Sequence, residues 1–196
     1  MIIDFSTTYK NYRDEILNFK GIWNYKCPIC DTSRSFQRHG TYPRFLIVLS
    51  EEGLCEQEID IQRLYCTSCK HTHAILPADV VPFCIYSMST IVHLLGSHLL
   101  EEKPVLTLAE ETGIPYQVIY SFLSLLSTYL SKITLLLRFL SLWEASSSPT
   151  LKQTLARITA YTPARFMVDY FNHDQLPLFL KRKDTSSYPL RFSGSG

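Results

Sequence analysis

The sequence predicts an α+β fold in which a small β-hairpin module packs on a mainly α-helical domain. Three observations lead to this prediction. Two Cys-x-x-Cys pairs flank a stretch of alternating β-branched and aromatic residues in the N-terminal third of the chain. From about residue 89 onwards, apolar residues recur with helical spacing instead. Hydrophobic residues make up 46% of the 196 residues, which is ample for a packed core.

The first elements are expected between residues 5 and 65. Residues 5–25 carry aromatic and aliphatic side chains three or four positions apart, which indicates a short amphipathic helix. Segments 41–50 and 56–65 flank the turn signal EEG and are rich in β-branched and aromatic residues. These two segments predict a β-hairpin between the cysteine pairs.

Helical patterns follow in the second half of the chain. Ser148 is a suitable N-cap there, and Pro149 fits the first position of a helix. Beyond about residue 172 the sequence is irregular. The expected helices cover about residues 89–100, 107–112, 115–143, 149–161 and 163–172.

Composition shifts divide the chain into four segments. We expect an N-terminal helix and the β-hairpin with its two cysteine pairs, here called the cysteine module, in 1–84. A helical pair with a long apolar helix is expected in 85–145. A C-terminal helical segment with a basic tail covers 146–192. The last four residues, SGSG in 193–196, resemble an artificial linker.

The two cysteine pairs predict a zinc site. Cys27 and Cys30 form the first pair and Cys66 and Cys69 the second, with 35 residues between the pairs. Zinc prefers four ligands in a tetrahedron, and two such turns joined by a hairpin supply them, as in a zinc ribbon. Four thiolates leave no coordination position for water, so we expect one structural Zn²⁺ per chain and no catalysis.

Other interpretations of these residues stay open at this point. The four cysteines could be two unrelated buried or redox pairs, although a reducing compartment and the hairpin spacing favour metal. His71 and His73 lie close enough in sequence to Cys69 to replace a ligand, but solvent-facing or hydrogen-bonding roles are more common for such residues.

The stretch LTLAEETGIPYQVIYSFL fits a helix-turn-helix with its turn at Gly113. Its second helix would expose Tyr116, Gln117 and Tyr120, and glutamine can contact adenine through two hydrogen bonds. However, Pro104 to Ser131 contains no lysine or arginine, whereas phosphate contacts usually dominate DNA affinity. Any helical hairpin with a glycine turn partly imitates the motif.

Local charge is more informative than the net charge of +1. Residues 32–50 contain three arginines and no acid, residues 90–145 are net acidic, and residues 146–196 are net basic. Positive charge attracts phosphate. The expected phosphate contacts are therefore the basic residues of the cysteine module and of the tail: Arg34, Arg38, His39, Arg44, Lys181, Arg182 and Lys183.

The N-terminus has no secretory leader pattern, so we expect a cytoplasmic protein. Of the 26 residues from Val118 to Trp143, 17 are apolar or aromatic. Lys132, Arg138 and many serines interrupt this run, so the helix is expected in a core or a subunit interface rather than in a membrane.

Three stretches resemble a known family: CPIC at 27–30, RHGTYPR at 38–44 and IQRLYCTSCKHTHAILPADVVPF at 61–83. They are similar to the N-terminal zinc-binding region of insertion-sequence transposases. They are still more similar to a bacterial family of unassigned function, built as a zinc ribbon followed by a helix-turn-helix, over about residues 25–130. The resemblance implies double-stranded DNA binding linked to mobile genetic elements. It does not bring catalysis, because those transposases carry their acidic triad in a further, much larger domain.

The sequence thus predicts a non-enzymatic zinc-binding DNA-binding protein, an accessory or regulatory factor related to mobile elements. The alternative is a protein-interaction adaptor whose zinc ribbon and long apolar helix bind a partner or a second copy. A metal-dependent hydrolase would need an open metal position, for which the sequence offers no ligand pattern.

Overall fold

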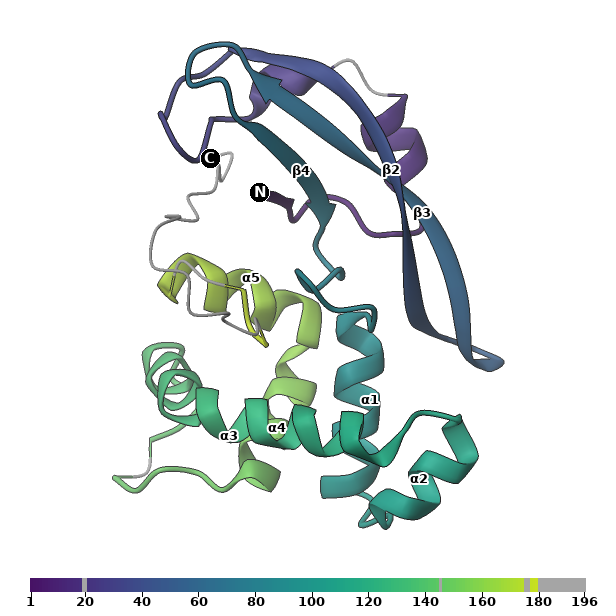
Figure 1. Ribbon diagram of the computed structural model, residues 1–196. Coiled ribbons are helices and arrows are strands. Elements are labelled where there is room, and N and C mark those ends of the chain that lie inside the picture. Colours follow the sequence, from purple (N-terminus) through teal and green to yellow (C-terminus); the bar gives the residue numbers. More distant parts are fainter. Residues whose placement is uncertain (19–20, 145, 175–176, 180–196) are drawn as a thin grey trace.

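The computed structural model describes residues 1–18, 21–144, 146–174 and 177–179, and Figure 1 shows a β-sheet on one side of a group of helices. The strands are β1 (Ile2–Asp4), β2 (Phe36–Ser50), β3 (Gly53–Cys66) and β4 (Thr72–Pro77). The α-helices are α1 (Met88–Leu99), α2 (Val105–Thr112), α3 (Tyr116–Phe139), α4 (Leu151–Tyr161) and α5 (Pro163–Asp174). The predicted α+β class is confirmed.

The sheet is mixed, with strand order β1-β4-β3-β2. The predicted hairpin is present as β2 and β3, which are longer than the sequence indicated and pair down to Ser50 opposite Gly53. Gly53 has a φ of 115°, a conformation that glycine adopts at no steric cost. Two further pairings were not expected: β4 runs antiparallel beside β3, and β1 runs parallel beside β4.

The amphipathic helix expected in residues 5–25 was a wrong prediction for most of that segment. The described part holds a five-residue π-helical turn, η1 (Arg13–Leu17), and a short 3₁₀ turn, η2 (Ile22–Asn24). The apolar side chains that suggested a helix, such as Tyr12 and Ile16, are buried against the sheet instead. The Tyr12 hydroxyl donates to the Ile75 carbonyl oxygen at 2.7 Å, which ties this segment to β4.

One irregularity shapes the hairpin near the cysteines. Arg38 pairs with Leu64, but the next paired position on β2 is Gly40, opposite Arg63. His39 is therefore the extra residue of a β-bulge. Gly40 accommodates the distortion with a φ of 110°. Bulges bend a strand and redirect side chains, so this bulge determines the direction of the His39 ring.

The helices begin and end close to the predicted residues. Ser87 caps α1 by accepting the backbone N–H of Thr90, and Gly113 ends α2 in the left-handed conformation. The exception is α4, whose N-cap is Thr150 rather than the expected Ser148. Thr150 forms a reciprocal capping box with Gln153, which satisfies two backbone N–H groups, whereas Leu151, three residues after Ser148, has no side-chain acceptor for such a box.

Buried apolar residues form two clusters. One contains the buried sheet residues, among them Leu46, Ile61 and Leu64, together with the cysteine turns. The other joins all five α-helices, so that segments 85–145 and 146–179 share one core within the described residues. Along the sequence, the last buried residue of the sheet cluster is Val80, and the first buried residue of the helical cluster is Val81.

Arg44 links the sheet to the start of the helical part. Its Nη2 group donates to the carbonyl oxygens of Val81 and Cys84, at 2.7 and 2.8 Å. The backbone N–H of Ile47 also donates to the Ile85 carbonyl oxygen at 2.7 Å. The connecting segment 81–86 therefore lies against the edge of β2, and this contact positions α1.

Among the described residues, α3 is the one helix long and apolar enough to span a membrane by length and composition. Within its most apolar stretch, 28% of the residues are buried in the protein. The inward side carries Ile119, Phe122, Leu126, Ile133, Leu136 and Leu137. Its exposed side carries polar residues such as Ser124, Ser127, Ser131 and Lys132, and also the large apolar residues Leu135 and Phe139.

Candidate metal site

The two Cys-x-x-Cys segments fold into equivalent turns. In the first, the N–H of Asp31 donates to the Cys27 carbonyl oxygen at 2.8 Å; in the second, the N–H of Lys70 donates to the Cys66 carbonyl oxygen at 2.9 Å. Asp31 and Lys70, each directly after the second cysteine, both have a left-handed φ, of 59° and 64°. The same sequence spacing thus produces the same local structure twice.

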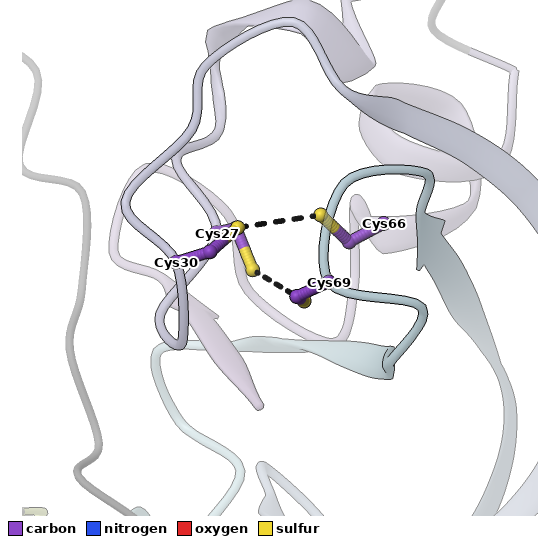
Figure 2. Close-up of side chains that lie close together, drawn as sticks. All are labelled: Cys27, Cys30, Cys66 and Cys69. Atoms are coloured by element: carbon purple, nitrogen blue, oxygen red, sulfur yellow. Dashed lines mark hydrogen bonds between the residues drawn. The ribbon is translucent and has the colours of Figure 1, made fainter.

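These turns bring the four sulfur atoms together, as Figure 2 shows. The ligand atoms of Cys27, Cys30, Cys66 and Cys69 all lie within 4.8 Å of one another. The Sγ atoms of Cys27 and Cys69 are 3.5 Å apart, and those of Cys30 and Cys66 are 3.7 Å apart. A tetrahedron of thiolates at the usual Zn–S bond length has S–S edges of about 3.8 Å. The cluster therefore has the dimensions of a four-thiolate metal site.

Backbone N–H groups point at the sulfur atoms in the same pattern in both turns. The N–H groups of Ile29 and Cys30 face the Cys27 sulfur, and those of Ser68 and Cys69 face the Cys66 sulfur. Such N–H groups compensate the negative charge of thiolates. Four thiolates around one divalent metal ion would leave an excess of negative charge, so these donors favour a metal-bound form.

The same N–H donors lower the pKa values of the thiols, whereas burial raises them. Burial raises the pKa of the Cys27 thiol to about 12 in spite of its two N–H contacts. Burial acts in the same direction on Cys66, but the N–H groups of Cys69 and Ser68 and the Ser35 hydroxyl outweigh it and lower that pKa to about 6. Thiolates rather than thiols bind metal ions, so metal binding displaces the protons that the four cysteines carry.

The two histidines near Cys69 have different roles. His71 is exposed, and its Nδ1 lies 2.8 Å from the Cys69 carbonyl oxygen. His73 is buried, and its Nε2 lies 3.5 Å from the Cys27 sulfur. Burial lowers the pKa of His73 to about 4, with the positive N-terminus and His71 acting in the same direction. A neutral His73 supports the cluster from outside, as a hydrogen-bonding partner of a ligand.

Two of the arginines predicted to contact phosphate already hold the fold together. The Arg38 guanidinium donates to the carbonyl oxygens of Ile16 and Leu17 and to Oε1 of Gln62. Arg44 holds segment 81–86, as described above, and burial lowers its pKa. These contacts give both residues a structural role, and phosphate contact by them stays a prediction.

The remaining predicted nucleic-acid contacts lie in two places. Arg34 and His39 are exposed on the cysteine module. Tyr116, Gln117 and Tyr120 are exposed at the start of α3, and Figure 1 places this helix end beside α2, at the far side of the molecule from the cysteine turns. The exposed residues of the cysteine module and those of α3 therefore lie far apart, a separation that the sequence pattern did not reveal. Lys181, Arg182 and Lys183 lie outside the described residues.

Several residues around the cluster were not predicted from the sequence. Lys26 and Lys70 are exposed and directly flank Cys27 and Cys69. The Ser35 hydroxyl lies 3.3 Å from the Cys66 sulfur, and the Thr32 hydroxyl 3.1 Å from the Cys30 sulfur. Their direct adjacency to the cysteines in the sequence could have placed the two lysines beside the cluster. The position of Ser35 beside Cys66 depends on the fold and has no such sequence signal.

Comparison with known families gives one match. Residues 27–111, which run from the first cysteine into α2, match the model of a domain of unknown function, DUF6431. No curated protein and no solved structure matches the chain. The segment similar to this domain contains all four cysteines, the β2–β3 hairpin and α1.

Proposed function

We propose that this chain is a zinc-stabilised, non-catalytic nucleic-acid-binding protein whose phosphate contacts come from the cysteine turns. The observation that carries the proposal is the separation of charge along the sheet. Residues 26–41 and 61–77 contain five lysines and arginines and one acid, whereas the hairpin tip, residues 51–60, contains five acids and no base. A polyanion is attracted to the first end and repelled by the second.

Three cations at the cysteine turns are suited to phosphate contact. Lys26, Arg34 and Lys70 are exposed and belong to the segments that flank or follow the cysteines. A bound zinc ion fixes both turns, so it would hold these side chains at constant spacing. The metal would then affect nucleic-acid binding only by holding the cysteine turns in place. A closed shell of four thiolates offers no coordination position for substrate or water.

The target that the family resemblance favours is duplex DNA of mobile elements. The α2–α3 pair fits the helix-turn-helix pattern: Leu108, Ile114 and Ile119 are buried, and Gln117 is exposed at the start of α3. The start of α3 lies far from the cysteine turns (Figure 1). In this proposal, α3 therefore contacts bases of a second DNA segment, or bases of a DNA segment that a second protomer holds.

The test is a salt titration of binding, measured by fluorescence anisotropy on random duplex DNA and on duplexes from element ends. The variant Lys26→Gln/Arg34→Gln/Lys70→Gln should bind all duplexes more weakly and flatten the slope of log affinity against log salt by about two to three units. The control Lys10→Gln/Arg13→Gln/Arg157→Gln removes the same charge from exposed residues elsewhere. Equal slopes for both variants, or no binding by the wild type at low salt, would contradict the proposal.

A second candidate function is a protein-interaction adaptor. The observation in its favour is a set of exposed apolar side chains on α2 and α3: Leu106, Tyr116, Tyr120, Leu135 and Phe139. Self-association or partner binding through these helices would bury that surface. Light scattering on the wild type and on Leu135→Ser/Phe139→Ser distinguishes this function: an oligomer that the substitutions dissociate favours the adaptor, and a monomer in both leaves self-association unsupported.

A further inference from the structure

The outer face of the sheet near the cysteine turns carries a group of aromatic, basic and polar side chains from three strands. Tyr65 lies opposite Gln37 on β2 and Thr72 on β4, and directly opposed residues share a face of a sheet. Arg63, two residues before Tyr65, lies on that face too. The alternate residues of β3, Leu64 and Cys66, are buried on the other face.

The β-bulge adds His39 to this face. As the unpaired residue between Arg38 and Gly40, His39 points its ring toward Tyr65, with ring centroids 5.9 Å apart and an interplanar angle of 32°. His39 is exposed and Tyr65 is half-buried. The two rings thus form a small aromatic surface that solvent reaches.

Cations and hydrogen-bonding groups surround the two rings. The Arg63 guanidinium donates to the Thr72 hydroxyl at 2.9 Å, which fixes it beside Tyr65. Lys70 and His71 directly precede Thr72 and are exposed at the same end of the sheet. The two segments that contribute to this face, residues 37–40 and 63–74, contain no acidic residue. Charge therefore favours a polyanion here.

The rings decide which polyanion fits. A duplex buries the faces of its bases in its own stack, whereas unpaired nucleotides offer them to aromatic side chains. Three strands span about 10 Å across the sheet, which allows contact with roughly two neighbouring bases. An arginine beside the rings can hold the phosphate between those bases.

We infer that this face, formed by Gln37, His39, Arg63, Tyr65 and Thr72, is a binding surface for single-stranded nucleic acid, with bases stacked on Tyr65 and His39. The inference rests on the proposed nucleic-acid binding and adds single-stranded nucleic acid to the duplex DNA proposed there as a target. Lys26, Arg34 and Lys70 supply general attraction for phosphate, and the aromatic pair supplies the preference for unpaired bases.

The experiment compares a labelled oligothymidylate single strand with a labelled hairpin duplex by fluorescence anisotropy at one salt concentration. Tyr65→Ala should lower affinity for the single strand by about 5- to 150-fold and leave duplex affinity within about twofold, since stacking involves unpaired bases. Tyr65→Phe keeps the ring and should bind like the wild type. The control is Phe45→Ala, which removes an exposed aromatic from the same hairpin, 62% exposed, away from this face.

Zinc content is measured on every variant to show that the turns are intact. If Tyr65→Ala loses zinc, His39→Ala carries the test, because its exposed ring can be removed without disturbing the core, and an approximately fivefold or greater loss is expected. Single-strand affinity unchanged in Tyr65→Ala, or lost equally for the duplex, overturns the inference. Wild-type binding to the duplex alone overturns the inference but leaves the proposed function standing, and binding to neither oligonucleotide overturns both.

Discussion

Replacing Arg44 by methionine should destabilise the protein by about 2–4 kcal/mol. The substitution keeps an apolar stem and removes the Nη2 donors that hold the Val81 and Cys84 carbonyl oxygens. A hydrogen bond from a charged group contributes about 1.5–3 kcal/mol, so two give about 3–6 kcal/mol. We expect a value below that upper end because Arg44 is half-buried and water can reach part of the vacated position.

The assay is urea unfolding of zinc-saturated protein, followed by far-ultraviolet circular dichroism. The matched control is Arg157→Met on α4, an exposed arginine whose replacement should change the free energy of unfolding by less than about 0.5 kcal/mol. A loss in Arg44→Met no larger than in this control would refute the idea that Arg44 joins the sheet to segment 81–86.

Two further substitutions test local features of the fold. Tyr12→Phe should cost about 1–3 kcal/mol, because it leaves the Gln62 N–H and the Ile75 carbonyl oxygen without their partner; an unchanged urea midpoint would argue against this contact. Burial raises the pKa of Tyr12 above its usual 10.0, so its contribution is complete below about pH 10 and is lost as pH rises further. The difference between wild type and Tyr12→Phe should therefore shrink in alkaline urea titrations, and a constant difference would contradict this. Thr150→Ala should cost about 1 kcal/mol through loss of the capping box with Gln153, and a thermal midpoint equal to that of the wild type would contradict it.

Local patterns predicted the parts of the structure that depend on neighbouring residues. The two Cys-x-x-Cys turns follow from their spacing, and the β2–β3 hairpin follows from its alternation and from Gly53 at the turn. Gly113 likewise marked the end of α2. In each case the residues that determine the conformation lie within a few positions of it.

Features that depend on distant residues could not be predicted in this way. Tyr12 suggested a helix because helical and irregular segments can both bury regularly spaced side chains, and only β3 and β4 supply its hydrogen-bond partners. Arg38 and Arg44 look like free surface charges in the sequence, because the carbonyl groups they bind belong to segments about 20 and 40 residues away. The bulge at His39 shows only in the pairing register.

The metal site underlies both the fold of the cysteine turns and the proposed function, and elemental analysis of the purified protein tests it most directly. We expect one zinc per chain in the wild type and in Cys55→Ser, which replaces a half-buried cysteine of β3 outside the cluster. Cys27→Ser/Cys66→Ser should bind none, and amide hydrogen exchange should show lost protection in β3 and β4. Absence of zinc from the wild type, or full zinc content in the double variant, would contradict the account.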